Sequence, residues 1–144
     1  MTELELQAQV ADYIRLQYPD VIFHSDFGSG IKLTMGQAIK QKRLNGGRRS
    51  WPDMFLAEPD IGKTDGSKRA FEKIWFGLFI ELKREGTRIF KKDGTLVSDA
   101  HIREQYDMLE QLRRRGYAAE FGIGFDATKK LIDDYMKGNY AHND

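Results

Sequence analysis

Two acidic residues and a lysine stand at the ends of two segments that have the composition of β-strands. Residues 74–85 (IWFGLFIELKRE) carry apolar side chains in both alternation phases up to Ile80, which predicts a strand covered on both faces. In a strand, Glu81 and Lys83 point to one face and Leu82 to the other. The pattern therefore predicts a carboxylate beside an ammonium group at the end of a buried strand.

A second acid, Asp53, stands in the segment SWPDMFLA, residues 50–57. Pro52 cannot donate a hydrogen bond to a sheet and belongs at the start of a strand, so Asp53 is expected as the first strand residue. Two carboxylates on neighbouring strands can hold a hard cation such as Mg²⁺, and without a cation they would repel each other. A bound metal activates water and shields the charge on a phosphate, and a lysine can orient that water. These residue types favour hydrolysis of phosphodiester bonds.

Residues 2–18 predict an amphipathic helix with Thr2 as its N-cap. At 100° per residue, Glu3 falls on the same face as Leu6, whereas Glu5 falls nearly opposite. Glu3 is therefore expected to face the protein interior. The alternative is a structural role, because an acid in the first turn also suits the helix dipole.

Gln105 lies inside the apolar face of another predicted helix, where a buried amide needs hydrogen-bond partners. The order of helices and strands indicates an α/β (α+β) fold with a mixed sheet, in a single domain spanning residues 1–144. The remaining predicted elements are a strand at 21–26, a helix at 34–44, a hairpin at 88–97, a helix at 98–115, a strand at 117–125 and a final helix capped by Asp126.

Positive charge is unevenly distributed along the chain, although the net charge is only +1. From Ile31 to Ser50 there are six lysines or arginines and no acid, which is typical of residues that neutralise phosphates. A solvated surface is the alternative interpretation. Further basic residues follow Glu81 in the sequence. Together, the candidate DNA-binding residues are Lys32, Lys40, Lys42, Arg43, Arg48, Arg49, Arg84, Arg88, Lys91 and Lys92.

Several classes of function lack support in the sequence. The absence of cysteine excludes thiolate zinc sites and a cysteine nucleophile. The three histidines, His24, His101 and His142, form no metal-ligand spacing and are interpreted as incidental. No serine-centred elbow is present, so a small-molecule hydrolase is not supported. No apolar run approaches ~20 residues, which leads us to expect a cytoplasmic protein without a membrane partner.

The combination of these motifs resembles the VRR-NUC family of the PD-(D/E)XK nuclease superfamily, in its small stand-alone phage and bacterial form. Members of this family often have a small residue before Pro-Asp, whereas this chain has Trp51. Trp51 could stack on a base or pack under its loop, and packing is the favoured interpretation. The resemblance implies a restriction-endonuclease-like core and a Mg²⁺ or Mn²⁺ cofactor. The residues that carry it are Glu3, Pro52-Asp53, Glu81-Leu82-Lys83 and Gln105.

The resemblance also assigns roles to these residues. Asp53 and Glu81 would be metal ligands, with the backbone carbonyl of Leu82 as a further ligand. Glu3 would assist directly or through water and is a possible ligand. Lys83 would position the attacking water, and Gln105 would stabilise the site.

For partners, the resemblance implies branched DNA, such as a Holliday junction, bound by a homodimer. The expected activity is endonucleolytic cleavage that leaves a 5′-phosphate. Two alternatives remain open. One is a nuclease of the same fold that acts on linear or flap DNA. The other is a non-catalytic DNA-binding module, which the joint presence of Asp53, Glu81 and Lys83 disfavours.

Overall fold

The computed structural model describes residues 1–27, 32–60 and 74–142. Within these ranges no helix has the length and apolar composition that a membrane span requires. Residues 58–72, whose polar and glycine-containing sequence predicts a surface excursion, lie mostly outside the described residues. The elements are α1 (Glu3–Gln17), β1 (Phe23–Ser25), α2 (Met35–Leu44), β2 (Met54–Leu56), β3 (Leu78–Lys83), α3 (Ala100–Arg114), β4 (Ala118–Ile123) and α4 (Gly124–Met136).

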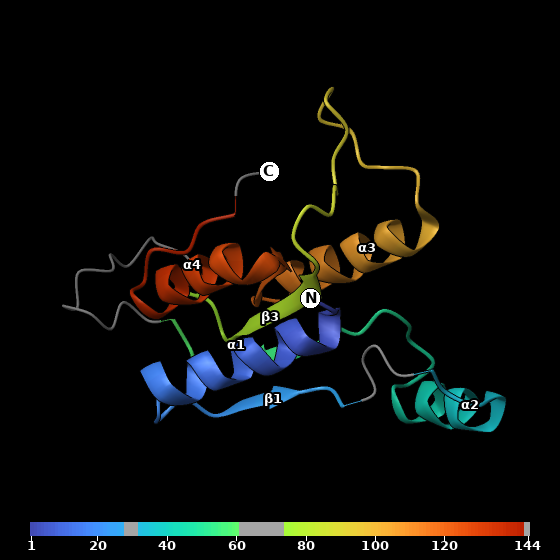
Figure 1. Cartoon of the computed structure of the whole chain (residues 1–144), viewed down its shortest axis with the longest axis horizontal. Coiled ribbons are helices and arrows are strands. Elements are labelled where there is room, and N and C mark those ends of the chain that lie inside the picture. Colours follow the sequence, from blue (N-terminus) through green and yellow to red (C-terminus); the bar gives the residue numbers. More distant parts are fainter. Residues whose placement is uncertain (28–31, 61–73, 143–144) are drawn as a thin grey trace.

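The four strands form one mixed sheet in the order β1-β2-β3-β4. β1 and β3 both pair antiparallel with β2, and β4 pairs parallel with β3. Figure 1 shows α3 and α4 alongside β3, and α2 set apart from the other helices. The expected mixed sheet flanked by helices is confirmed.

All six residues of β3 are buried, as the two-phase apolar pattern predicts. Leu78, Ile80 and Leu82 belong to the larger core cluster, which also contains side chains of α1 and α4. Phe79 belongs to a second cluster, with α3. Because side chains alternate along a strand, Glu81 and Lys83 share the face of Phe79. The catalytic candidates on β3 therefore lie on the side of the sheet that α3 covers.

The helix starts follow local signals in the sequence, with one exception. Thr2 is the N-cap of α1, as predicted, and it forms a capping box there. Thr34-Met35-Gly36-Gln37 has the sequence form of a capping box, and Thr34 forms one at the start of α2. The expectation that Asp126 caps the last helix is wrong, because α4 begins at Gly124 and Asp126 lies in its first turn without a capping hydrogen bond. Gly124 adopts a φ of +77°, which lets the chain turn from β4 directly into α4.

The predicted hairpin is present as a turn with little strand pairing. Asp93 accepts hydrogen bonds from the backbone and hydroxyl of Thr95, and Gly94 has a φ of +86°. A single bridge joins Phe90 and Leu96. The Asp-Gly signal thus specifies the turn, while the flanking segments form no regular strands.

A carboxylate on α4 ties this helix to α1. Tyr13 and Tyr18 donate to Asp133 Oδ1 at 2.5 and 2.6 Å, and Lys129 bonds Oδ2 at 2.9 Å. Burial alone would raise the pKa of Asp133, but these three donors outweigh it and lower the pKa below its usual value. The ionised carboxylate therefore stabilises the contact between the two helices.

Replacing Asp133 with alanine is expected to destabilise the protein by about 1–3 kcal/mol near neutral pH. Because the folded pKa of Asp133 is depressed, its contribution is present above the unfolded pKa of about 3.9 and is lost as the pH falls through the folded value. The free energy of unfolding is measured by urea titration at pH 7 and pH 3. The difference in this free energy between wild type and variant should be smaller at pH 3. Asp134→Ala is the control: this acid only pairs with an exposed lysine, so a loss of less than about 1 kcal/mol is expected. Equal losses in both variants would contradict the interpretation.

Candidate functional site

Asp53 directly precedes β2 and is held against β3 through its side chain. Its Oδ2 accepts a hydrogen bond from the backbone N–H of Leu82 at 2.7 Å. Its own carbonyl accepts from the N–H of Asp26 at 2.8 Å, which links it to the end of β1. Asp53 as a residue is 8% exposed. Three neighbouring strands thereby fix the position of this acid.

Glu81 lies beside Asp53 and is 5% exposed. Burial, the charge of Asp53 and hydrogen bonding with Asp53 raise the pKa of Glu81 far above its usual value, while the charge of Lys83 acts in the opposite direction. Two carboxyl groups are thus held close together with little solvent around them. Neighbouring acids in this arrangement favour either a shared proton or a bound cation.

Lys83 is buried on the same face of β3 as Glu81. It forms no ion pair with any residue that the structure describes, although its charge acts on Glu81. A buried ammonium group usually has a carboxylate partner at hydrogen-bond distance. Lys83 therefore has donors available for a substrate or a water beside the two acids.

Gln105 on α3 is buried, as expected, and its Nε2 donates to Glu81 Oε1 at 2.9 Å. The amide thus turns its NH₂ group towards Glu81, whose Oε1 accepts the hydrogen bond. The same Nε2 lies 3.1 Å from Nε2 of His101, which can accept a hydrogen bond there in its neutral form. Gln105 thereby fixes the orientation of the Glu81 carboxylate.

Glu3 is half-buried at the start of α1, whereas Glu5 is exposed and completes the capping box, so Glu3 faces inward as expected. The charge of Glu3 contributes to the raised pKa of Glu81. Among the described residues, no three His, Asp or Glu side chains come close enough together to hold a metal ion. Glu3 is thus near the acidic pair without completing a three-carboxylate cluster.

The backbone of Leu82 offers a further oxygen near Asp53. The strand register pairs Met54 with Ile80, and continuing it by two residues places Pro52 opposite Leu82. In an antiparallel pair, the N–H and C=O of one residue point to the same neighbouring strand. Pro52 has no N–H to donate. The sheet therefore leaves the Leu82 carbonyl without a ladder donor on the side where Asp53 lies.

The oxygen atoms of Asp53, Glu81 and the Leu82 carbonyl are suitable ligands for a hard divalent cation. Both close side chains, Asp53 and Glu81, supply carboxylate oxygens, and the Leu82 carbonyl adds a neutral oxygen. Mg²⁺ prefers oxygen ligands and typically keeps several waters, so two carboxylates are enough to hold it. The pKa of Glu81 is raised first by burial and then by the charge of Asp53, and a cation bound between the two acids would oppose both effects.

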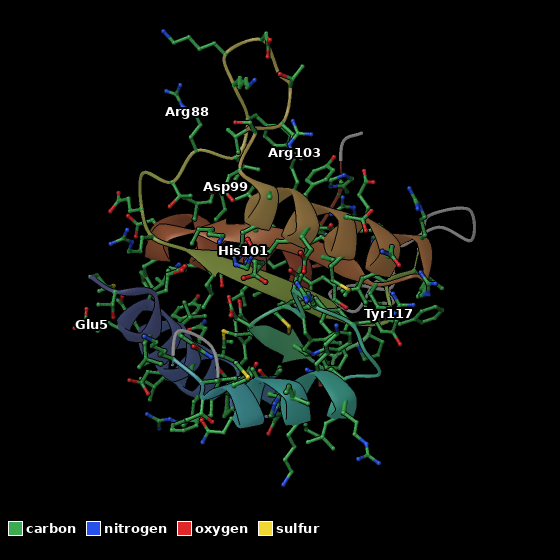
Figure 2. The ribbon with its side chains drawn as sticks, turned by 90° about the vertical axis from the view of Figure 1, so that its right-hand side faces the viewer. Glu5, Arg88, Asp99, His101, Arg103 and Tyr117 are labelled. Atoms are coloured by element: carbon green, nitrogen blue, oxygen red, sulfur yellow. The ribbon has the colours of Figure 1, made fainter. Side chains whose placement is uncertain are left out.

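The acidic pair opens into a cleft of about 580 Å³ between α2, the 48–51 loop and the first turns of α3. Positive and apolar side chains line the same cleft. Figure 2 shows the hairpin that carries Arg88 projecting on the opposite side of His101 from α2. The side chains that line the cleft beside Asp53 and Glu81 include Asp26, Met35, Ile39, Lys42, Arg48, Arg49, Trp51, His101 and Gln105.

All ten basic residues singled out in the sequence are exposed, and none forms an ion pair with a described residue. Lys42, Arg48 and Arg49 line the cleft, whereas Lys32, Lys40 and Arg43 do not. Lysines on α4, by contrast, pair with acids one turn away. The remaining four basic residues come after β3 in the chain. Arg84 directly follows the strand, and the hairpin carries Arg88, Lys91 and Lys92.

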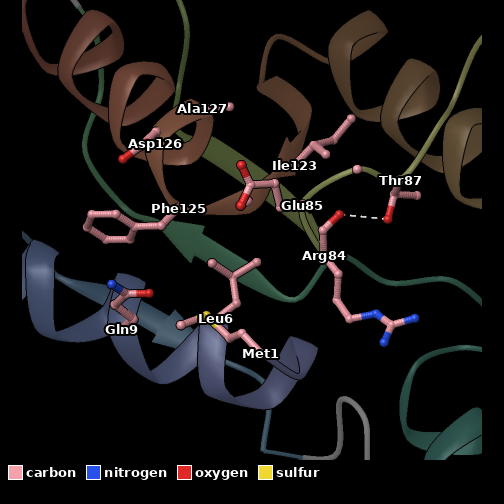
Figure 3. A pocket seen from close by; sticks show the side chains of 12 residues that line it. Met1, Leu6, Gln9, Arg84, Glu85, Thr87, Ile123, Phe125, Asp126 and Ala127 are labelled. Atoms are coloured by element: carbon pink, nitrogen blue, oxygen red, sulfur yellow. Dashed lines mark hydrogen bonds between the residues drawn. The ribbon is translucent and has the colours of Figure 1, made fainter.

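A larger cavity of about 940 Å³ lies between the start of α1, the start of α4 and the loop after β3. Figure 3 shows Arg84 at its edge, with the side chain pointing away from Glu85 and Asp126. Neither Asp53 nor Glu81 lines this cavity. The smaller cleft is therefore the one that contains the candidate catalytic acids.

Two residues at the site, Gln7 and His101, are not indicated by the sequence patterns. Gln7 is buried and donates to Ser25 Oγ at 2.6 Å and to the carbonyl of Asp26 at 2.9 Å, so it braces the β1 end that holds Asp53. His101, which has no metal-ligand spacing in the sequence, lines the cleft and contacts Gln105. Helical spacing could have found both, since Gln7 lies four residues from Glu3 and His101 lies four residues from Gln105.

Trp51 packs edge-on against Phe79, with ring centroids 5.4 Å apart, as the favoured interpretation predicts. It nevertheless remains 43% exposed, and it lines the cleft. Packing against the protein therefore leaves part of the indole free for another contact.

A comparison with solved structures finds the same fold in a protein described as "VRR_NUC domain protein". The two share 23% sequence identity with a TM-score of 0.59, over 95% of this chain and 89% of that chain. No model of a protein family matches the sequence, and no curated protein matches it. The chain thus has the fold of a VRR-NUC domain. The candidate site is supported by the arrangement of Asp53 and Glu81 in this chain itself.

Proposed function

We propose that this protein is a metal-dependent DNA endonuclease that hydrolyses phosphodiester bonds. The observation that carries the proposal is the pair of buried carboxylates, Asp53 and Glu81, held together in a cleft whose lining cations form no ion pair with a described residue. The shared fold with a VRR-NUC domain protein supports the same class of function. A structural ion pair would not account for the arrangement, because both groups are acids.

The residues of the site divide the work of hydrolysis between them. Asp53, Glu81 and the Leu82 carbonyl would hold Mg²⁺ or Mn²⁺, which when bound activates water and stabilises negative charge on the phosphate. Lys83 donates to the attacking water or to a phosphate oxygen. Gln105 keeps the Glu81 carboxylate in position through its Nε2 hydrogen bond. Glu3, which lies near the pair without joining it closely, would act through water.

The substrate we propose is branched DNA, such as a Holliday junction, cut by a homodimer in the cytoplasm of a bacterium or a phage-infected cell. Basic residues on both α2 and the hairpin support a substrate that extends to either side of the acidic pair. Two such sites in a dimer would face two strands of one junction.

The proposal is tested by incubating the protein with four-way, flap and linear DNA of equal length, with Mg²⁺, Mn²⁺ or EDTA. Cleavage of the four-way junction that requires a divalent cation and leaves a 5′-phosphate is the expected result. Preference for the flap or linear substrate would contradict the proposed branched-DNA substrate but would still support a nuclease. DNA binding without cleavage under any condition would contradict the enzyme and favour a binding module. Sedimentation with and without the junction tests the dimer.

The cleft cations are expected to bind phosphates, since they have no acidic partners in the described structure. The double variant Arg48→Ala/Arg49→Ala should weaken binding to every DNA and reduce the slope of log affinity against log salt by about one to two units. Fluorescence anisotropy in EDTA at several salt concentrations measures this slope.

Lys130→Ala is the matched control, because Lys130 is exposed on α4 and already paired with Asp134 at 2.6 Å. Its binding affinity and salt slope should match those of the wild type. An unchanged slope in the double arginine variant would remove Arg48 and Arg49 from the DNA-binding surface.

A further inference from the structure

Part of the cleft wall is apolar, and the chemistry proposed above does not use it. Met35 and Ile39 on α2 are 82% and 65% exposed, and Trp51 is 43% exposed. Met35, Ile39 and Lys42 recur at helical spacing and all line the cleft, so one face of α2 presents apolar side chains followed by a cation. Exposed apolar groups gathered in a concave site usually mark a binding surface.

Trp51 is held firmly although part of its ring is exposed. The preceding residue, Ser50, has a φ of +60°, an uncommon conformation for a residue with a side chain. Ser50 Oγ donates to Glu104 on α3 at 2.8 Å, which ties the loop to that helix. Pro52 restricts the backbone on the other side, and the ring rests edge-on against Phe79. The indole therefore presents a fixed surface to the cleft.

The chemistry of the cleft fits a nucleotide. A flat indole and two apolar side chains can contact the face of a base, while Lys42, Arg48 and Arg49 can contact its phosphates. The volume of about 580 Å³ is within the usual range for small-ligand sites. The acidic pair lines the same cleft, so a nucleotide bound there would lie next to the phosphate that is cut.

We propose that this cleft binds one unpaired nucleotide beside the scissile phosphate, with its base stacked on Trp51. The inference rests on the proposed nuclease function and refines it. Inside a duplex, neighbouring bases cover both faces of each base, so Trp51 has no free face to stack on. An unpaired nucleotide at a branch point or strand end offers one. Trp51 thus makes the enzyme selective for DNA that is locally unpaired at the cleavage position.

The first test compares single-turnover cleavage of a fully paired duplex with that of the same duplex carrying unpaired nucleotides at the cleavage site. Wild type should favour the unpaired substrate, and Trp51→Ala should reduce this preference roughly tenfold or more, as expected for the loss of one stacked base. Trp51→Phe should retain part of it. Phe76→Ala is the matched control, since Phe76 is an exposed aromatic residue that does not line the cleft. An unchanged preference in Trp51→Ala would overturn the inference.

The second test needs no cleavage. The protein has two tryptophans, and Trp75 is only 7% exposed, so quenching by an added oligonucleotide reports mainly on Trp51. In EDTA, single-stranded DNA should quench wild-type fluorescence but not that of Trp51→Phe, and equal quenching of the two would overturn the inference. Quenching that rises with protein concentration without DNA would also overturn it, since a second copy of the chain would then cover the cleft. If no DNA is cut with Mg²⁺ or Mn²⁺, the proposed nuclease function fails, and quenching alone still decides whether the cleft binds unpaired nucleotides.

Discussion

Replacing Asp53 with asparagine is expected to lower metal-dependent DNA cleavage by roughly a thousandfold or more, which corresponds to several kcal/mol of lost transition-state stabilisation. Asparagine keeps an oxygen that can accept the N–H of Leu82, so the loop and the strand should remain in place. What it removes is one of the two negative charges that would hold the cation. Calorimetry with Mn²⁺ should show correspondingly weaker binding.

Asp134→Asn is the control for this experiment, because Asp134 is an acid on α4 whose partner is an exposed lysine. Its cleavage rate should equal that of the wild type. Neither variant should unfold at a lower temperature than the wild type, and Asp53→Asn, which also removes the repulsion with Glu81, should unfold slightly higher in EDTA. A loss of cleavage can then not be ascribed to a loss of fold. An Asp53→Asn variant that cuts DNA at more than a tenth of the wild-type rate would remove Asp53 from the catalytic residues.

Replacing Glu81 with glutamine is expected to change stability and activity in opposite directions. Without a divalent cation, the wild type holds two carboxyl groups together in a buried position, and a neutral amide removes their repulsion. Gln105 can still donate to the new side-chain oxygen. The variant should therefore be more stable than the wild type by about 1–2 kcal/mol in EDTA, which is a few degrees in Tm for a protein of this size. Its cleavage rate should fall as far as that of Asp53→Asn.

Thermal unfolding with and without Mn²⁺ measures this prediction. Added Mn²⁺ should raise the Tm of the wild type, because a ligand that binds the folded state stabilises it. Glu81→Gln should show little or no rise. Phe76→Ala serves as the control for the metal response, since this side chain lies outside the cleft and should show the full wild-type shift. A Glu81→Gln variant that is less stable than the wild type in EDTA would contradict the account of the buried acidic pair.

The helix starts and the buried strand could be predicted because their determinants are local. Each capping box lies within four consecutive residues, and the alternation that places Glu81 and Lys83 on one face is a property of the strand itself. The start of α4 was predicted wrongly for a related reason. Asp126 carries a good local signal for an N-cap, but the tight turn at Gly124 after β4 takes precedence over it.

The contacts within the site could be predicted less well. The sequence indicates that Gln105 is buried and needs a partner, but only the packing of α3 against the sheet shows that its partner is Glu81. The link from Gln7 through the end of β1 to Asp53 joins segments far apart in the chain, and no local pattern encodes it. The sequence gives no signal for His101, because the three histidines lack metal-ligand spacing. Its position in the cleft follows from the packing of α3.

By itself, the sequence determined which side chains could do chemistry: two acids and a lysine at strand ends, an inward acid on the first helix and an amide on the third. Residue type and the two-residue period of a strand were sufficient for that. The tertiary structure decided that Asp53 and Glu81 meet as a buried pair, that Glu3 stays just outside it, and that α2 and Trp51 turn this place into a cleft. These outcomes depend on strand pairing and helix packing between distant segments, which local patterns do not specify.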